Sequence, residues 1–307
     1  MLLLVALAFC AYSLISQWDA TRAALASMSW STVGGAFAAG LAALFAWMLG
    51  WRAFLTGLGS PLPLRAAARV NYISQLGKYV PGKVWALVSQ IELARKYDVP
   101  RLRSVSATLL AVATSIAAGL AVAAVTLPLT SPEATAKYWW LFLLAPIVLA
   151  GLHPRIVTWG LNLILKVVRR PPLEHPVSTA TTLRAVAWTV LGWALFGVHT
   201  WLLCIAAGGS GAGLPFRATG AYALAFTAGF LVFIAPGGIG AREAALVITL
   251  SPVLPAGAPI VVALVSRVVL TVADLVSAGG AVLLGRRGGT GPATPAGEQA
   301  DQPDLTA

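Results

Sequence analysis

The sequence is short of charged residues and of the side chains that hold metals or perform catalysis. Only 10% of its 307 residues are charged, whereas a soluble domain carries about 25%. Two cysteines and three histidines are scattered and form neither a disulfide framework nor a metal-ligand spacing. No Ser-His-Asp spacing is present, and the glycines of 208–211 form an outer turn without the context of a phosphate loop. We therefore expect no enzyme, no cofactor and no metal.

Long apolar runs are what the sequence has instead, with 58% of its residues hydrophobic. About 20 consecutive apolar residues span a bilayer as a helix. Such runs predict six full spans, near 1–17, 32–51, 104–128, 138–152, 183–207 and 260–284. We therefore expect an all-α polytopic membrane protein, with a transmembrane domain at 1–285 and a disordered cytoplasmic tail at 286–307.

The basic residues indicate how the chain crosses the membrane. Sixteen of the 21 Lys and Arg lie in 52–103, in 153–184 or directly after the last run. Only Arg22, Lys137 and Arg217 fall in the opposite loops. Because basic loops stay in the cytoplasm, we expect a bacterial plasma-membrane protein with both termini cytoplasmic. The net charge of +11 does not indicate nucleic acid, since the cations fill gaps between apolar runs.

Proline and glycine interrupt two further apolar regions, 71–91 and 220–254. The first contains YVPGKVWALVSQIELA at 79–94 and the second IAPGGIGAREAALVIT at 234–249. The basic residues predict that the first enters from the cytoplasm and the second from outside. Paired discontinuous helices of this kind are typical of transporters built from an inverted repeat. We therefore predict two re-entrant helical hairpins in an inverted repeat.

The alternative for both regions is a full span with an ordinary proline kink. In the second region, residues 220–236 and 244–259 could each just cross the bilayer. Arg242 and Glu243 would then form a cytoplasmic loop pair.

A helix that begins at a break inside the membrane points free N–H groups and its positive dipole end into the site, where a phosphate would bind. Arg267 and Asp274 share one face of the last span, and buried ions are usually paired. We expect Glu243 to pair with Arg267, and Arg242 or a lysine of the first hairpin to pair with Asp274. The predicted binding residues are Asn71, Gln75, Lys78, Pro81, Gly82, Lys83, Trp85, Pro236, Gly237, Gly238, Gly240, Arg242, Glu243, Arg267 and Asp274.

Each of these predictions has a structural alternative. Arg267 and Asp274 could form salt bridges that only hold helices together. Asn71 and Gln75 could cap the broken backbone, and Trp85 could be an anchor at the membrane interface.

Asn71, the stretch GKYVPGK at 77–83 and the stretch APGGIGARE at 235–243 carry a resemblance to a known family. They resemble the flippase-like transmembrane domain of lysylphosphatidylglycerol synthases, and the resemblance covers about residues 1–285. It implies movement of a lipid with a polar head group between leaflets. Many members have a Glu-Arg pair in the span after the first motif, but residues 109–120 are uncharged. Because only a short tail follows the last span, we expect a free-standing member that lacks the synthase domain.

The sequence as a whole predicts flipping or scrambling of a phosphate-bearing lipid. An anionic phospholipid and a polyprenyl-phosphate-linked glycolipid both fit, with the cations of the two hairpins and Arg267 offsetting the phosphate charge. The alternative is a non-transporting membrane partner that anchors or regulates a lipid glycosyltransferase. A homodimer is left open.

Overall fold

The computed structural model describes residues 16–80, 84–151, 177–231 and 240–286, with four isolated positions between 156 and 166. Within these residues the ordered elements are eleven α-helices and two 3-10 helices, and no strand occurs among them. The predicted all-α class is confirmed. The predicted tail lies outside the described residues after Arg286.

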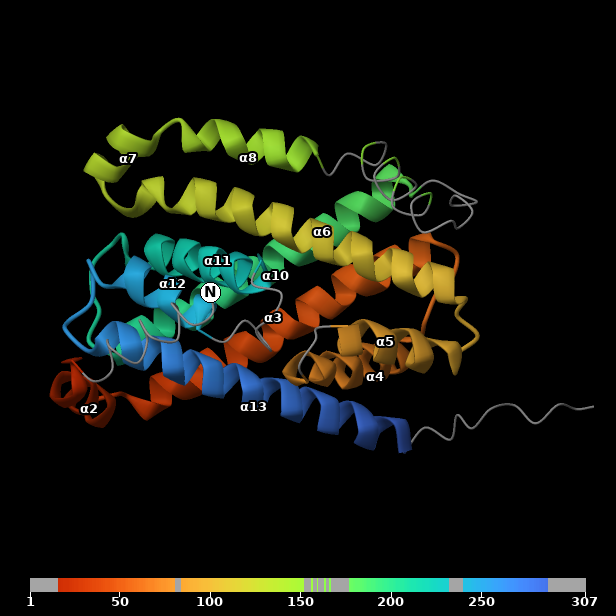
Figure 1. The fold of residues 1–307 in the computed structure, drawn as a ribbon, viewed down its shortest axis with the longest axis horizontal. Coiled ribbons are helices and arrows are strands. Elements are labelled where there is room, and N and C mark those ends of the chain that lie inside the picture. The colour runs from red at the N-terminus through yellow and green to blue at the C-terminus, as the bar shows by residue number, and fades with distance from the viewer. Residues whose placement is uncertain are drawn as a thin grey trace, which may run out of the picture.

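Among the described residues, four helices are long and apolar enough to cross a membrane. They are α3 (Trp30–Gly57), α6 (Arg101–Thr126), α10 (Thr179–Ala206) and α13 (Ala258–Arg286). At 1.5 Å per residue the shortest of them is about 39 Å long, which exceeds the hydrocarbon thickness of about 30 Å. In Figure 1, α6 and α13 lie on opposite sides of the bundle and α3 and α10 cross obliquely between them; the four helices match four of the six predicted runs.

Small residues and one aromatic cluster hold these helices together. Glycines let α3 and α10 approach closely, as is usual between membrane helices: a Cβ on Gly192 would collide with the ring of Trp47. Around that contact, Trp47 meets Trp193, Phe196 and Phe226 edge to face, with ring centroids 4.9 to 5.1 Å apart. Aromatic pairs favour this edge-to-face arrangement, so the cluster stabilises the packing at the centre of the bundle.

The first broken region folds as a hairpin. Helix α4 (Leu64–Gln75) leads through the 3-10 helix η1 (Leu76–Tyr79) to helix α5 (Val84–Arg95), and α4 packs against α5. The two arms meet at Gly77, where a Cβ would lie 2.6 Å from the backbone nitrogen of Ala86.

The two open ends of this hairpin lie together. Leu62 and Ala66 before and at the start of α4 share a hydrophobic cluster with Ala94 and Val99 around the end of α5. The hairpin therefore enters and leaves at one end of the bundle. We call this end the basic end, because Arg65, Arg95, Arg101 and Arg103 lie there.

The second broken region folds as a hairpin that opens at the opposite end, the far end. Helix α11 (Leu214–Leu231) begins and helix α12 (Ala241–Leu250) finishes in one hydrophobic cluster, which contains Leu214 and Leu250. Helix α12 is about 15 Å long, half the hydrocarbon thickness. This geometry does not fit two short spans with Arg242 in a cytoplasmic loop. In Figure 1 the α4–α5 and α11–α12 hairpins lie at opposite ends of the bundle.

Two of the six predicted spans are not confirmed. Residues 1–15 lie outside the described residues; Gln17, just beyond them, accepts a hydrogen bond from the Gly257 backbone N–H at 2.9 Å, at the far end. Of the run near 138–152, helix α8 (Leu141–Ala150) covers the middle, and helix α7 (Pro132–Tyr138) ends at its first residue. Helix α8 contains Pro146 and is about 15 Å long, too short to cross alone. The count of six and the inverted repeat stay predictions.

Candidate functional site

The tip of the first hairpin is bonded to helix α13 through Asp274. The Nζ of Lys78 lies 2.6 Å from the Oδ2 of Asp274. The hydroxyl of Tyr79 donates to the same oxygen at 2.6 Å and approaches the hydroxyl of Thr271 at 3.4 Å. Asp274 is only 5% exposed, whereas the Lys78 side chain is 33% exposed. A single buried carboxylate therefore holds the tip through two donors.

The start of α12 is bonded to the same helix through Arg267. The Nη1 of Arg267 donates to the Oε1 of Glu243 at 2.6 Å. The other carboxylate oxygen, Oε2, accepts the backbone N–H of Gly240 at 2.7 Å. Gly240 has φ +85°, a conformation that favours glycine, and α12 begins at the next residue. Glu243 thus caps its own helix while it pairs with α13, and both of its oxygens are bonded.

Arg242 lies beside this pair and is bonded differently. Its Nη2 donates to the hydroxyl of Tyr222 at 2.9 Å, and its guanidinium carbon lies 4.8 Å from the centroid of that ring. Tyr222 is 2% exposed and stacks on Phe196, so the support is rigid. Within the described part of the chain Arg242 has no carboxylate partner. A cation in the first turn of a helix adds to the positive end of the helix dipole, so this position favours a bound anion.

Helix α13 brings the two tips into one site. Arg267 and Asp274 are separated by seven residues, which is two turns or about 10.5 Å along one face. The predicted Glu243–Arg267 pair is confirmed. Of the two partners predicted for Asp274, the first-hairpin lysine is correct, in the form of Lys78, and Arg242 is not its partner.

The structure gives less information about the other predicted binding residues. Asn71 is buried in α4, and its backbone carbonyl accepts a hydrogen bond from Ser74 at 2.8 Å. Gln75 at the end of α4 is half-buried, and Trp85 in the first turn of α5 is 53% exposed. Six predicted residues lie outside the described residues and stay predictions: Pro81, Gly82, Lys83, Pro236, Gly237 and Gly238.

Sequence reasoning missed the neutral residues that orient the ions. The hydroxyl of Tyr79 donates to Asp274 and approaches that of Thr271, and the hydroxyl of Tyr222 accepts a hydrogen bond from Arg242. Tyr79 stood inside the first motif, and Thr271 precedes Asp274 by nearly one helical turn. Tyr222 gave no signal, because an aromatic residue in an apolar run is usually part of the core.

A buried histidine connects three long helices next to the site. The Nδ1 of His199 lies 2.9 Å from the carbonyl oxygen of Ala36, and its Nε2 lies 2.9 Å from the hydroxyl of Ser266. Because a carbonyl only accepts, Nδ1 carries the hydrogen, and Nε2 accepts from Ser266. Ser266 directly precedes Arg267, so this link fixes the rotation of α13 at the site.

The bundle of long apolar helices with two opposed hairpins defines a polytopic membrane protein. Residues 1–278 match the model of the family described as the lysylphosphatidylglycerol synthase TM region. The chain therefore belongs to this family, as the resemblance at the two hairpin motifs predicted. A search of curated proteins gives no match. Across the part of the chain that the structure describes, no group of three or more His, Cys, Asp or Glu is placed to hold a metal.

Proposed function

We propose that this membrane protein moves a phosphate-bearing lipid between the two leaflets. The observation that carries the proposal is the pair of hairpins, which open at opposite ends of the bundle and are both bonded at their tips to α13, through Asp274 and Arg267. Discontinuous helices that meet from opposite sides form the substrate site in several transporter folds. The membership in a family named for a lipid synthase supports a lipid as the substrate.

The start of α12 is the proposed binding position for the phosphate. Arg242 supplies a cation that no described carboxylate offsets, and the helix dipole adds to the positive potential. Arginine also suits a phosphate because its planar guanidinium can donate two parallel hydrogen bonds. Tyr222 holds the guanidinium without neutralising it, so its charge stays open to the substrate.

The two ion pairs offer the phosphate further partners. Removing one member of a buried pair without replacement costs about 3–5 kcal/mol. A lipid phosphate that takes the place of Asp274 at Lys78 keeps the lysine paired, and so makes release of the hairpin tip less costly. The same exchange at Arg267 would free Glu243 and the start of α12. Alternate release of the two tips would expose the phosphate first at one end and then at the other, while the lipid tails stay in the bilayer.

The proposed substrate is an anionic phospholipid or a polyprenyl-phosphate-linked glycolipid. We propose transport without covalent chemistry and without a cofactor. The excess of Lys and Arg at the basic end supports an orientation with both termini in the cytoplasm.

Reconstitution of the purified protein into liposomes with a fluorescent phosphatidylglycerol tests the proposal. We expect translocation by the wild type, and a loss of at least tenfold in the Arg242→Gln/Lys78→Gln double variant. Arg22→Gln/Lys96→Gln is the matched control, because both side chains are exposed and far from the site. Wild-type activity in the site variant would refute the site. Failure of the wild-type protein alone to move lipid would favour a regulator of a lipid glycosyltransferase.

A further inference from the structure

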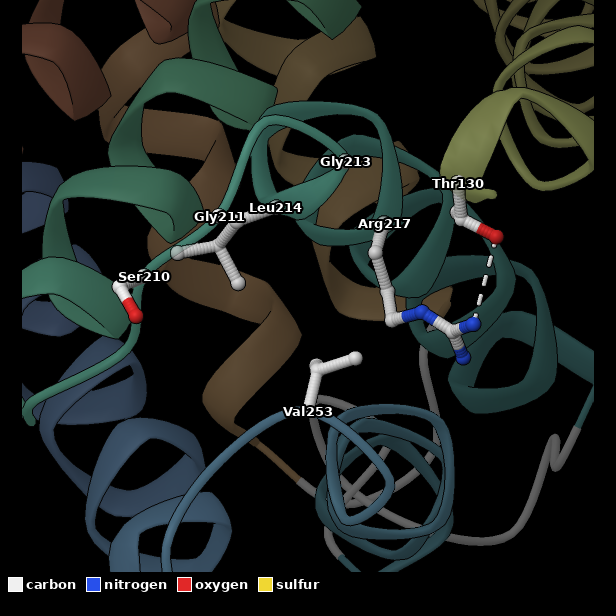
Figure 2. A pocket seen from close by; sticks show the side chains of 7 residues that line it. All are labelled: Thr130, Ser210, Gly211, Gly213, Leu214, Arg217 and Val253. Atoms are coloured by element: carbon white, nitrogen blue, oxygen red, sulfur yellow. Dashed lines mark hydrogen bonds between the residues drawn. The ribbon is translucent and has the colours of Figure 1, made fainter. Parts of the chain in front are cut away.

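A cavity with both polar and apolar lining residues lies at the far end of the bundle, away from the hairpin tips. It has a volume of about 180 Å³ and lies between the loop that precedes α11, the 3-10 helix η2 (Pro128–Thr130) and the segment after α12. Figure 2 shows Ser210 and Gly211 on one side, Arg217 and Thr130 on the other, and Val253 below. Water occupies about 30 Å³ per molecule in the liquid, so the cavity has room for a small polar group.

Arg217 is the charged residue of this cavity, and its guanidinium is poorly bonded. Its Nη1 donates to the carbonyl oxygen of Thr249 at 3.4 Å and its Nη2 to the hydroxyl of Thr130 at 3.3 Å. Both distances exceed the usual range of about 2.7–3.2 Å for N–H···O bonds. Its Nε is buried and has no hydrogen-bond partner among the described residues.

The charge of Arg217 is also uncompensated. Both of its partners are neutral oxygens, and no carboxylate contacts it in the described ranges. Arg217 as a whole is half-buried, but its Nε is buried, and buried polar groups of native proteins are normally satisfied. An arginine with an unsatisfied Nε, two long bonds and no described carboxylate partner, on the wall of a cavity, is therefore suited to bind an anion.

The walls of the cavity are built to stay open beside this arginine. Gly213 lies so close to the backbone oxygen of Thr130 that a Cβ there would collide with it, which seats the loop on η2. Gly211 has φ +108°, a conformation that favours glycine, and a Cβ there would meet nothing within 4 Å. The loop thus leaves space in front of Arg217 and presents the Ser210 hydroxyl toward it from the other side.

We propose that this cavity is a second anion site, which binds a phosphate group through the Arg217 guanidinium. The phosphate belongs either to the head group of a lipid in the leaflet at the far end or to free phosphate in solution. The cavity lies at the open end of the α11–α12 hairpin, where Arg217 of α11 bonds Thr249 of α12. Its lining shares no residue with the proposed transport site, so either proposal can fail alone.

Two measurements separate the sources of the phosphate. The first is thermal unfolding of the protein in detergent with inorganic phosphate against chloride at equal ionic strength, since a ligand that binds the folded state raises the unfolding temperature. The second is native mass spectrometry of the protein from phosphatidylglycerol and phosphatidylcholine nanodiscs, which counts retained lipids. Arg217→Gln is the test variant and Arg22→Gln the matched control, because Arg22 is exposed on α2 (Trp18–Ala26), also at the far end.

We expect binding at least tenfold weaker in Arg217→Gln and unchanged in Arg22→Gln. A response to inorganic phosphate identifies a soluble anion, and a retained lipid lost only in Arg217→Gln identifies a head group. If Arg217→Gln does not fold, Val253→Phe fills the cavity with the arginine intact and should abolish the same response. Equal phosphate and lipid binding by wild type, Arg217→Gln and Val253→Phe would overturn the proposal.

Discussion

The two hairpins contact the same helix with opposite charges. In the first, the hairpin supplies the cation, Lys78, and α13 supplies the anion, Asp274. In the second, the hairpin supplies the anion, Glu243, and α13 supplies the cation, Arg267. Under the proposed function, an anionic substrate would compete with Asp274 at the first tip and with Glu243 at the second. The difference shows that the cation belongs to the hairpin at the first tip and to α13 at the second. Under the proposed function, one phosphate would therefore release either hairpin, with its cation on the first hairpin in one case and on α13 in the other.

The two tips also differ in burial. Lys78 is 33% exposed at its side chain, so it can reach polar surroundings when its partner is lost. Glu243 is 9% exposed at its side chain and has no such route. We therefore expect a larger loss of stability when the second hairpin loses its partner on α13, Arg267, than when the first hairpin loses Asp274.

The largest effect should come from Arg267→Gln. This change leaves the buried Glu243 carboxylate without its cation, and removal of one partner of a buried pair costs about 3–5 kcal/mol. Thermal unfolding of the purified protein in detergent measures the loss. The Glu243→Gln/Arg267→Gln double variant removes both charges and should recover part of it. Equal unfolding temperatures for wild type and Arg267→Gln would contradict the account of this pair.

A smaller loss should follow from Asp274→Asn. It removes the ionic partner of Lys78 and weakens the hydrogen bond from Tyr79, and hydrogen bonds to charged groups contribute about 1.5–3 kcal/mol. The same unfolding experiment measures it against Arg267→Gln. If Asp274→Asn destabilises the protein more than Arg267→Gln does, the proposed difference between the two hairpins is wrong.

The backbone at the start of α12 should tolerate no side chain. Gly240→Ala places a Cβ at φ +85°, and a residue in such a sparsely populated conformation costs about 1–3 kcal/mol. Gly279→Ala is the matched control, because it lies in α13 with nothing within 4 Å of the added Cβ, and alanine favours the helix. Unfolding temperatures should fall for the first variant and hold or rise for the second. A loss of similar size in both would argue against strain at Gly240.

The smallest stability effect should come from Tyr222→Phe. It removes the hydroxyl that accepts from Arg242 but keeps the ring under the guanidinium, so about 1 kcal/mol of stability is at stake. Translocation in liposomes should fall more than stability does, since Arg242 would lose its fixed position. Unchanged translocation by Tyr222→Phe would show that this hydroxyl does not position the arginine for transport.

Much of this site could be predicted because charges in apolar runs are rare. Arg267 and Glu243 are costly in a membrane without a partner, and so their pairing followed from composition and spacing. Tyr222 and His199 could not be found in this way, because aromatic residues and single histidines are ordinary in a helical core. Their roles depend on which helices pack together.

The fold was predictable to a similar extent. Long uninterrupted apolar runs gave the four long helices, and Pro-Gly breaks gave both hairpins. The span near 138–152 stays a prediction, because α8 covers only Leu141–Ala150 of that run, follows Trp139 and Trp140 outside the helices, and contains Pro146. A proline inside a helix removes a backbone hydrogen bond. A prediction made from hydrophobicity alone does not include this cost.

Electron cryomicroscopy of the protein in phosphatidylglycerol nanodiscs tests the central claim most directly. The account predicts a lipid phosphate between the two hairpin tips, with an oxygen about 2.7–2.9 Å from a guanidinium nitrogen of Arg242. It also predicts that the phosphate has replaced Asp274 as the partner of Lys78, or Glu243 as the partner of Arg267. A preparation that translocates lipid, but in which lipid phosphates lie only at the membrane surfaces and both ion pairs stay closed in every resolved state, would contradict it.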